Sequence, residues 1–373
     1  MKKILLAALV FLVSFSIGCS QSSQVTDSSD PYAGRPLKNI TTLIDSRAKS
    51  IDWCHANNLI SYEQHGSDGY VDILILNPDT GQKSQLTDGN PLCPQKSNGN
   101  SAWYPTGEYI VFTAEKESNP ASLMHQAFPG YGYNCDLWLA KADGSVFWPL
   151  TDYPMYTRCV MHPHFSHSGT RLLWTECLGG SEGSVWGEWA LKIADFTMDE
   201  NGPHLANIKI YQSGQHHYFY EGHCFSADDN KILFTANSES QSDSGFDIYE
   251  LELQTGKTIK LTDTPNDWDE HAHYSPDGKY IAWASATGLG INITNTSDFA
   301  WEKQLITELW LMNSDGTGKQ RLTFFNSTGY PESLNGKRAI VADMTWSPDG
   351  KTIAIVVGLP DSTDARIFLV DFR

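Results

Sequence analysis

The chain has 373 residues, of which 44 are acidic and 26 are basic, so its formal net charge at pH 7 is −18. This charge argues against nucleic acid and against anionic lipid surfaces as partners. One strongly apolar segment occurs, at the N-terminus, and no second one follows, so the sequence also argues against a membrane-spanning protein.

The N-terminal segment has the features of an export signal. Lys2 and Lys3 form a positive start, and the apolar run Ile4–Val13 that follows is too short to cross a bilayer. A polar, serine-rich stretch comes after this run. The pattern predicts that the segment directs export and does not belong to the folded domain.

The end of this segment, Ser16-Ile17-Gly18-Cys19, resembles the box of bacterial lipoproteins, in which the cysteine becomes the lipidated first residue. The resemblance predicts a signal peptide over residues 1–19, lipidation of Cys19 and a flexible tether over residues 20–36. Because Ser20 rather than aspartate follows the cysteine, it implies an outer-membrane lipoprotein that faces the periplasm and touches the membrane only through its lipid anchor. An ordinary secretory signal with a coincidental cysteine is the alternative.

A sequence motif recurs six times along the rest of the chain. Its clearest copies are Tyr274–Trp283 and Trp346–Ile355, in which an aromatic residue precedes Ser-Pro-Asp-Gly-Lys and a mainly apolar run. The copies start 49 to 72 residues apart, which is the length of a propeller blade with loop insertions. In chain order, the aromatic residues that open the six copies are Trp53, Trp103, Phe165, Phe225, Tyr274 and Trp346.

Each copy predicts four antiparallel strands. Pro-Asp-Gly is typical of a tight turn between the first two, and the run after it is rich in β-branched and aromatic residues. A third strand follows, and a fourth ends in a recurrent Leu-Thr pair. The sequence therefore predicts an all-β, six-bladed β-propeller as a single domain over residues 37–373. A seven-bladed ring is the alternative, although no strands for a seventh blade are identifiable.

The two ends of the domain complement each other. The last copy has its third strand at Arg366–Phe372, and the chain then stops without a fourth. Near the N-terminus, Leu37–Ile44 has the composition of a strand but belongs to no copy. We therefore expect this segment to complete the last blade and close the ring, which removes an exposed sheet edge.

The repeats resemble the TolB-type, WD-like propeller repeats of bacterial periplasmic proteins. The copies that open at Tyr274 and Trp346 are near that consensus, and the resemblance covers nearly all of residues 37–373. Such propellers serve as binding scaffolds and as enzymes, so the fold does not choose the function. The expected function is a monomeric cell-envelope scaffold that binds an envelope protein or an oligosaccharide ligand.

Six cysteines follow Cys19, and an exported compartment permits disulfides between them. Cys54 and Cys224 fall in blades one and four, on opposite sides of the ring, so we do not expect them to pair. The other four cysteines are candidates for disulfides within a blade. Blade two contains Cys93 and Cys135, and blade three contains Cys159 and Cys177.

Histidines recur at matching positions in three successive blades. His164 and His273 lie one residue before the aromatic residue of their copies, His162 and His271 lie three residues before it, and His223 belongs to the same strand of the blade between. Alternate residues of a strand share a face, so these five imidazoles are predicted to converge at the central channel. Such a cluster suits a divalent transition metal. The alternative is a set of buried histidines hydrogen-bonded within the channel.

Two neighbouring groups of residues are expected to have other roles. The run His216–Tyr220 is expected to be a loop at the rim. Asp267, Asp269 and Glu270, just before the second histidine pair, are expected to form a solvated acidic loop rather than to supply metal ligands.

The layout of the histidines also resembles that of oligogalacturonate lyases, propellers that hold a divalent metal with a His-x-His pair on one blade and a histidine on its neighbour. His271 and His273, or the equivalent pair of blade three, match this layout together with His223. Where the family has a glutamine, three residues before the first histidine of the pair, this chain has Trp268 or Cys159. The resemblance implies a metal-dependent carbohydrate-active enzyme as the alternative function, with Arg158 as the nearest cation for an acidic sugar.

Overall fold

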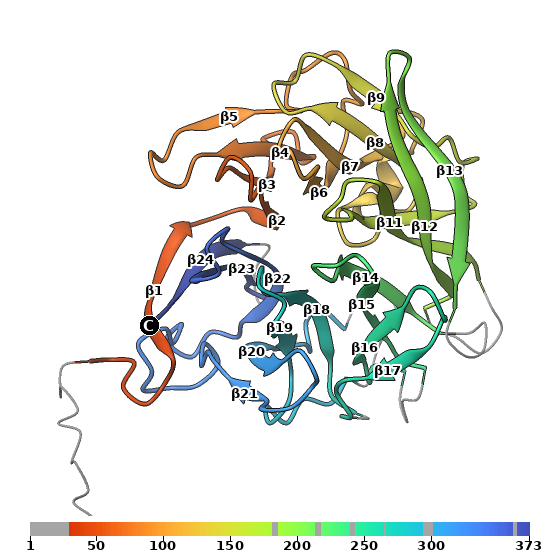
Figure 1. Ribbon diagram of the computed structural model, residues 1–373. Coiled ribbons are helices and arrows are strands. Elements are labelled where there is room, and N and C mark those ends of the chain that lie inside the picture. Colours follow the sequence, from red (N-terminus) through yellow and green to blue (C-terminus); the bar gives the residue numbers. More distant parts are fainter. Residues whose placement is uncertain are drawn as a thin grey trace, which may run out of the picture.

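The computed structural model describes residues 30–180, 186–212, 218–238, 243–264, 266–293, 301–360 and 364–373. Within them the strands form six four-stranded antiparallel sheets arranged as blades around a common axis (Figure 1). This confirms the all-β, six-bladed propeller rather than seven blades. The predicted signal peptide, Cys19 and most of the tether lie outside the described residues, as do His216 and His217 of the predicted rim loop.

Five blades are built from consecutive strands. Blades one and two hold β2 (Ala48–Trp53), β3 (Ile60–His65), β4 (Val71–Leu76), β5 (Lys83–Gln85) and β6 (Asn98–Trp103), β7 (Tyr109–Glu115), β8 (Cys135–Lys141), β9 (Phe147–Pro149). Blades three and four hold β10 (Cys159–Phe165), β11 (Arg171–Gly179), β12 (Glu188–Asp199), β13 (Gly202–Tyr211) and β14 (Tyr220–Phe225), β15 (Lys231–Ala236), β16 (Asp247–Glu252), β17 (Thr258–Lys260). Blade five holds β18 (Asp269–Tyr274), β19 (Tyr280–Ser285), β20 (Glu308–Asn313) and β21 (Gln320–Arg321).

The sixth blade combines the two ends of the described chain. Its first three strands are β22 (Ile340–Trp346), β23 (Thr352–Gly358) and β24 (Ala365–Phe372), and its outermost strand is β1 (Leu37–Ile44), which pairs antiparallel with β24 from Leu37–Phe372 to Ile44–Ile367. The innermost strands β2, β6, β10, β14, β18 and β22 contact one another in cyclic order. How far the ring depends on β1 for its closure stays a prediction.

The Ser-Pro-Asp-Gly motif forms the turn that the sequence predicted. The Ser275 hydroxyl donates to Oδ1 of Asp277 (2.7 Å), which also accepts the backbone N–H of Lys279 (3.1 Å). Ser275 Oγ in turn accepts the N–H of Tyr280 (3.0 Å). Gly278 has φ +68°, a conformation that favours glycine. The turn is therefore held by its own side chains as well as by the strands that it joins.

The recurrent Leu-Thr pair locks the fourth strand to the third. In blade four, Thr262 Oγ1 accepts the N–H of Ile248 (2.9 Å) and donates to Asp247 (3.0 Å), which opens β16. A threonine and an acidic residue make the same bond in three other blades. These pairs are Thr87–Asp72 (2.9 Å), Thr151–Asp136 (3.1 Å) and Thr323–Glu308 (2.7 Å).

The apolar core lies between the blades. Val111 and Leu139 of blade two pack in one cluster with Leu172 and Trp174 of blade three, and Trp174 is fully buried. Truncating a buried tryptophan of this kind to alanine costs about 3–5 kcal/mol. This packing fixes each innermost strand against its neighbours.

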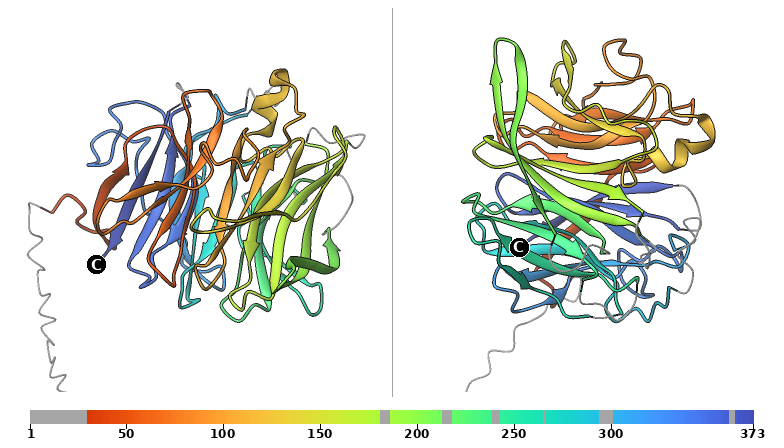
Figure 2. Two further views of the ribbon diagram at one scale, coloured as in Figure 1. Left: turned by 90° about the horizontal axis from the view of Figure 1, so that it is seen from above. Right: turned by 90° about the vertical axis from the view of Figure 1, so that its right-hand side faces the viewer.

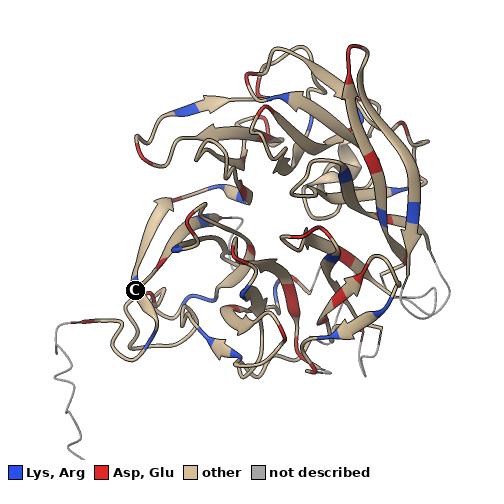
Figure 3. Cartoon of the chain, viewed as in Figure 1, with Lys and Arg blue, Asp and Glu red and all other residues tan. Residues whose placement is uncertain are grey.

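Outside the sheets, the hairpin of β12 and β13 is much longer than the outer strands of most other blades and projects from the ring (Figures 1 and 2). A short 3₁₀ helix covers Ala121–Ala127. Among the described residues, no helix has the length and apolar character that a membrane crossing requires. Acidic and basic positions are distributed around the whole ring rather than gathered in one basic patch (Figure 3).

Candidate functional site

The candidate site lies where β10, β14 and β18 meet at the axis. The rings of His162 and His271 are 5.5 Å apart between centroids, and those of His164 and His273 are 5.7 Å apart. In each of these contacts one histidine comes from blade three and the other from blade five. Blade four lies between these blades in the ring, so the side chains meet near its axis. The ring of His223, from blade four, lies 5.7 Å from His271 and 6.4 Å from His273. The structure thus brings all five predicted histidines together.

A β-bulge shapes each innermost strand at this level. In β10 the register shifts between Met161 and His164, and in β18 it shifts between Glu270 and His273. His162 and His271 have φ +51° and +53°, which are left-handed values that non-glycine residues adopt infrequently. A bulge bends the strand and redirects a side chain. Simple strand alternation, the basis of the sequence prediction, therefore does not describe how these side chains are placed.

The sequence prediction missed a carboxylate at the centre of this cluster. Oε1 of Glu221 lies 3.3 Å from Nε2 of His162, 3.7 Å from Nδ1 of His271 and 3.8 Å from Nδ1 of His223. This oxygen is buried and has no hydrogen-bond partner among the described residues. One signal was present in the sequence: Glu221 and Glu270 occupy the same position, four residues before the aromatic residue, in successive copies of the motif.

The prediction of a solvated acidic loop before His271 was wrong for two of its three residues. Asp269 and Glu270 belong to β18, and Asp269 is 1% exposed. Trp283 Nε1 donates to Asp269 (3.2 Å), and Trp268 Nε1 donates to Glu270 (2.6 Å). Indole donors from the same blade thus satisfy carboxylates that the strand buries.

The spacing of the donor atoms fits a metal ion. Donor atoms of His162, Glu221 and His271 all lie within 4.8 Å of one another. Metal bonds of about 2.1 Å in tetrahedral geometry place two ligand atoms about 3.4 Å apart. The two distances from Glu221 Oε1 to these imidazoles, 3.3 and 3.7 Å, are close to that value. A carboxylate oxygen that accepts no hydrogen bond is available for such a ligand role.

Further side chains would orient these ligands. His223 Nε2 is 2.7 Å from Thr235 Oγ1, which leaves Nδ1 on the side of Glu221. Glu270 Oε2 lies 3.6 Å from Nε2 of His271. Metal-bound imidazoles commonly hydrogen-bond through the second ring nitrogen, which fixes their tautomer and orientation. The contact of His223 with Thr235 follows this pattern.

Burial sets the charge of the histidines. Desolvation, followed by the neighbouring imidazoles, lowers the pKa of His162 and His164 to about 3, and desolvation lowers the pKa of His273 to about 4. The pKa values of His223 and His271 fall well below the usual value for the same first reason. All five are therefore neutral at pH 7, and a neutral imidazole is the form that binds a metal.

Burial acts on the two glutamates in the opposite direction. Desolvation, then repulsion from Glu270, raises the pKa of Glu221 well above its usual range. Desolvation also raises the pKa of Glu270 to about 7. The interaction between the two carboxyl groups raises the pKa of Glu221 and lowers that of Glu270. A cation in the cluster would favour the ionised form of Glu221.

A cavity of about 310 Å³ opens at one end of the ring, next to this cluster. Residues at the ends of all six innermost strands line it, including His164, His273 and the indoles Trp53 and Trp346. Asp52 also lines it and accepts the N–H of Trp103 (2.7 Å). None of the described residues that line this cavity is Lys or Arg.

The cation proposed from the sequence is engaged elsewhere. Arg158 Nε lies 3.2 Å from Glu176, and its Nη1 donates to the carbonyl of Leu178 (2.7 Å). A basic residue that the sequence reasoning did not consider, Lys49, lies on the innermost strand β2, where burial lowers its pKa. The nearby carboxylate of Glu63 raises the pKa of this amine and so opposes the effect of burial.

The six described cysteines are free thiols. Cys159 and Cys177 occupy directly opposite positions of β10 and β11. The thiol of Cys93 bonds to the carbonyls of Thr87 and Asn90, and that of Cys135 to the carbonyls of Ala127 and Tyr133, so each of these two thiols points toward its own segment. Whether either pair forms a disulfide stays a prediction.

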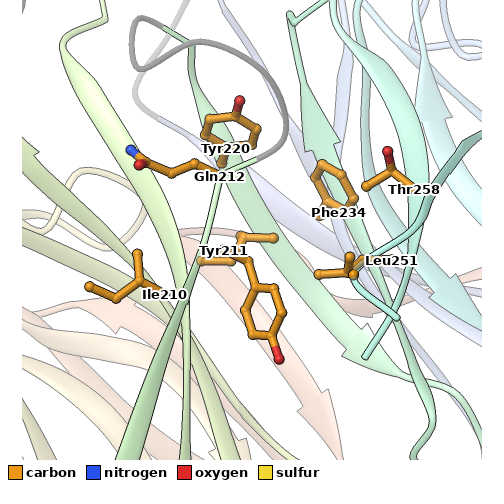
Figure 4. A pocket seen from close by; sticks show the side chains of 9 residues that line it. Ile210, Tyr211, Gln212, Tyr220, Phe234, Leu251 and Thr258 are labelled. Carbon is orange, nitrogen blue, oxygen red and sulfur yellow. The ribbon is translucent and has the colours of Figure 1, made fainter. Parts of the chain in front are cut away.

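A second cavity, of about 140 Å³, lies between the long hairpin of blade three and blade four (Figure 4). Its walls include Ile210, Tyr211, Phe234 and Leu251. It holds no carboxylate, imidazole or amine among its described lining residues, so it offers no acid–base or metal chemistry.

Comparison with known proteins supports the fold. No protein-family model matches the chain. A curated relative, the dipeptidyl-peptidase 5 of Porphyromonas endodontalis, is 30% identical in an alignment of 121 residues that covers 27% of this chain and 16% of the relative. The chain thus spans less than a fifth of that relative.

Solved structures with the same fold include a TolB from Agrobacterium tumefaciens, with a TM-score of 0.54 at 16% identity, covering 80% of this chain and 84% of that one. An oligogalacturonate lyase in complex with manganese gives 0.53 at 13% identity, covering 91% and 94%. A puromycin-hydrolysing peptidase of Mycobacterium tuberculosis gives 0.53 at 11% identity, covering 87% and 51%. These likenesses confirm the propeller fold, including the resemblance to TolB-type propellers, and they are too distant to define a function.

Proposed function

We propose that this protein is a cell-envelope β-propeller that binds a divalent transition-metal ion at its centre through His162, Glu221 and His271. The observation that carries the proposal is the buried Glu221 oxygen, which has no hydrogen-bond partner among the described residues and lies 3.3 to 3.8 Å from three neutral imidazoles. Burying such an oxygen is costly unless a proton or a cation compensates it. Imidazole nitrogens with one carboxylate oxygen suit zinc, iron, nickel or manganese.

The adjoining 310 Å³ cavity is the ligand-binding surface in this proposal. His164 and His273 line it and belong to the same histidine cluster, so a bound ligand would lie next to the metal site. When bound, the metal would polarise an oxygen of that ligand as a Lewis acid. The protein's own contribution is to keep the imidazoles neutral, hold Glu221 among them and provide aromatic walls. The principal function proposed is a binding scaffold for an envelope protein or an oligosaccharide.

A carbohydrate-active enzyme is the second candidate, and the charge of the cavity favours a version in which the metal binds the carboxylate of an acidic sugar. None of its described lining residues is Lys or Arg. A uronate carboxylate would therefore have the metal as its principal positive partner. In this version, binding of an oligogalacturonate requires the metal, whereas a scaffold for a neutral ligand or a protein does not need it for charge compensation.

The location in the cell envelope rests on the N-terminal segment. The positive start, the short apolar run and the cysteine at position 19 support export and lipid anchoring on the periplasmic side of the outer membrane. The acidic composition of the chain fits partners other than nucleic acid.

Elemental analysis of the purified protein, followed by calorimetric titration of the chelator-treated protein with Zn²⁺ and Mn²⁺, tests the metal proposal. We expect one ion per chain for the wild type and at least a 100-fold weaker affinity for Glu221→Gln and for His271→Gln, since each removes a ligand while nearly keeping the side-chain volume. His204→Gln is the matched control, because His204 lies on the exposed strand β13 beside Asp199. Equal affinities for all four proteins, or no binding, would overturn the proposal.

The same samples separate the two candidate functions. Trigalacturonate is added to the metal-loaded and to the metal-free protein, and both binding and the absorbance of an unsaturated product are followed. Product formation that requires the metal and Glu221 supports the enzyme. Metal binding without binding or turnover of the sugar supports the scaffold.

A further inference from the structure

We infer that Cys159 and Cys177 form a reversible cross-strand disulfide at the base of the strand that carries His162 and His164. Cys159 opens β10, and its Cα partner in β11 is Cys177. Directly opposite residues of an antiparallel pair have Cα atoms about 4.5–5.5 Å apart, which lies within the range that disulfides require. The two strands thus present the thiols at a separation that a bond can close without moving the backbone.

The side chains already interact. The Cys177 thiol also donates to the carbonyl of Gly179 (3.5 Å). The neighbouring Cys159 thiol, then Gly179 and Arg158, lower the pKa of Cys177 against the opposing effects of burial and Glu176, whereas Cys177 and then desolvation raise the pKa of Cys159. Cys177 is therefore the thiol that would attack first, and Cys159 the resolving thiol.

Both residues are partly exposed. Gly187 lies beside Cys177: a Cβ added there would be 3.6 Å from the sulfur, an ordinary contact, and 2.9 Å from the carbonyl oxygen of Gly179. The other predicted pair, Cys93 and Cys135, lacks this register, because Cys135 lies opposite Glu115 in the β7–β8 pair and Cys93 lies outside the strands of blade two.

The reaction is an exchange with a disulfide donor. The Cys177 thiolate attacks one sulfur of the donor, and the other donor sulfur leaves as a thiolate that takes up a proton. The Cys159 thiol then loses its proton and attacks the Cys177 sulfur of the mixed disulfide, which releases the second donor thiol. The two protein thiols lose two hydrogen atoms and two electrons, and the donor disulfide gains them.

The test uses the purified protein with oxidised glutathione as the donor, followed by intact mass and non-reducing peptide mapping. For the wild type we expect the loss of two hydrogen atoms and a peptide that joins Cys159 to Cys177. For Cys159→Ser we expect a stable glutathione adduct on Cys177, because no resolving thiol remains. For Cys177→Ser we expect slower modification of Cys159 than of Cys177 in Cys159→Ser, because burial, which the substitution leaves in place, still raises the pKa of Cys159.

Two controls keep the assignment specific. Cys93→Ser and Cys135→Ser should oxidise like the wild type, and reduction should return every protein to its starting mass. A wild type whose thiols all stay free in oxidised glutathione, or a map that joins either cysteine to a different partner, would overturn the inference. Because Cys159→Ser and Cys177→Ser each remove one thiol from the same strand pair, a difference between their adduct rates cannot come from misfolding alone if their circular dichroism spectra match.

Discussion

His162 and His271 belong to blades three and five, and their rings lie 5.5 Å apart beside the buried Glu221 carboxylate, with Nε2 of one and Nδ1 of the other 3.3 and 3.7 Å from its Oε1. Three blades thus contribute one side chain each to a single point. A site of this kind depends on the ring as a whole, because no single blade contains two of these three donors.

Thr235 should act as a positioning residue for the metal site. Its hydroxyl lies 2.7 Å from Nε2 of His223, so Thr235→Val removes the group that holds this ring. We expect about 10- to 100-fold weaker metal affinity by calorimetry, with an unchanged far-ultraviolet spectrum. Thr113→Val is the matched control, since Thr113 has the equivalent place in blade two and donates to the carbonyl of Gly99. If both variants bind the metal equally well, His223 has no part in the site.

Glu63 should make the protein less stable as the pH rises from 5 to 8. Its folded-state pKa is raised to about 7, first by desolvation, so the folded protein keeps a proton that the unfolded chain releases near pH 4.5. A raised carboxyl pKa means that the free energy of unfolding falls with increasing pH until the folded pKa is passed. The size of this fall between pH 5 and 8 is about 2 kcal/mol for a shift of this kind.

The measurement compares urea unfolding of the wild type and Glu63→Gln at both pH values, with chelator present. Glutamine resembles the protonated acid, so the variant should lose about 2 kcal/mol less than the wild type over this range. Glu108→Gln is the control, because Glu108 is exposed. Parallel pH curves for the wild type and Glu63→Gln would show that the Glu63 carboxyl is not protonated in the folded state.

Deleting β1 should weaken the whole ring. A chain that begins at Ser46 lacks the partner of β24 and exposes that edge. We expect a lower midpoint and a broader transition in calorimetric melting, together with a greater tendency to associate. A chain that begins at Asp30 is the control, because it keeps both β1 and the ion pair between Arg35 and Glu332. Identical melting of the two chains would mean that the ring closes without β1.

Cys19→Ala should release the protein from the membrane. Lipidation requires the cysteine sulfur, so the variant should appear in the soluble periplasmic fraction, while the wild type stays with membranes and carries lipid by mass spectrometry. Cys54→Ala, within the folded domain, should fractionate like the wild type. A wild type without lipid, or unchanged membrane association of Cys19→Ala, would contradict the lipoprotein prediction.

The sequence alone determined the architecture, because each copy of the repeat contains the residues that form its own turns and strand pairs. Ser275, Asp277 and Gly278 hold their turn by bonds within a few residues, and the Leu-Thr pair bonds to an acidic residue of the adjacent strand, so each copy specifies its own blade. The same repetition located the five histidines, since residues at matching positions of neighbouring copies lie at the same level of the ring.

Only the tertiary structure decided which groups form the site. The bulges at His162 and His271 change the direction of side chains in a way that simple strand alternation does not predict. Glu221 became visible as a candidate ligand only when its oxygen was found buried without a donor, which is a property of three blades packed together. Arg158 forms an ion pair with Glu176 on β11 of its own blade, so it does not take part in the site. Burial and contacts across blades depend on the closed ring, and the local sequence does not encode them.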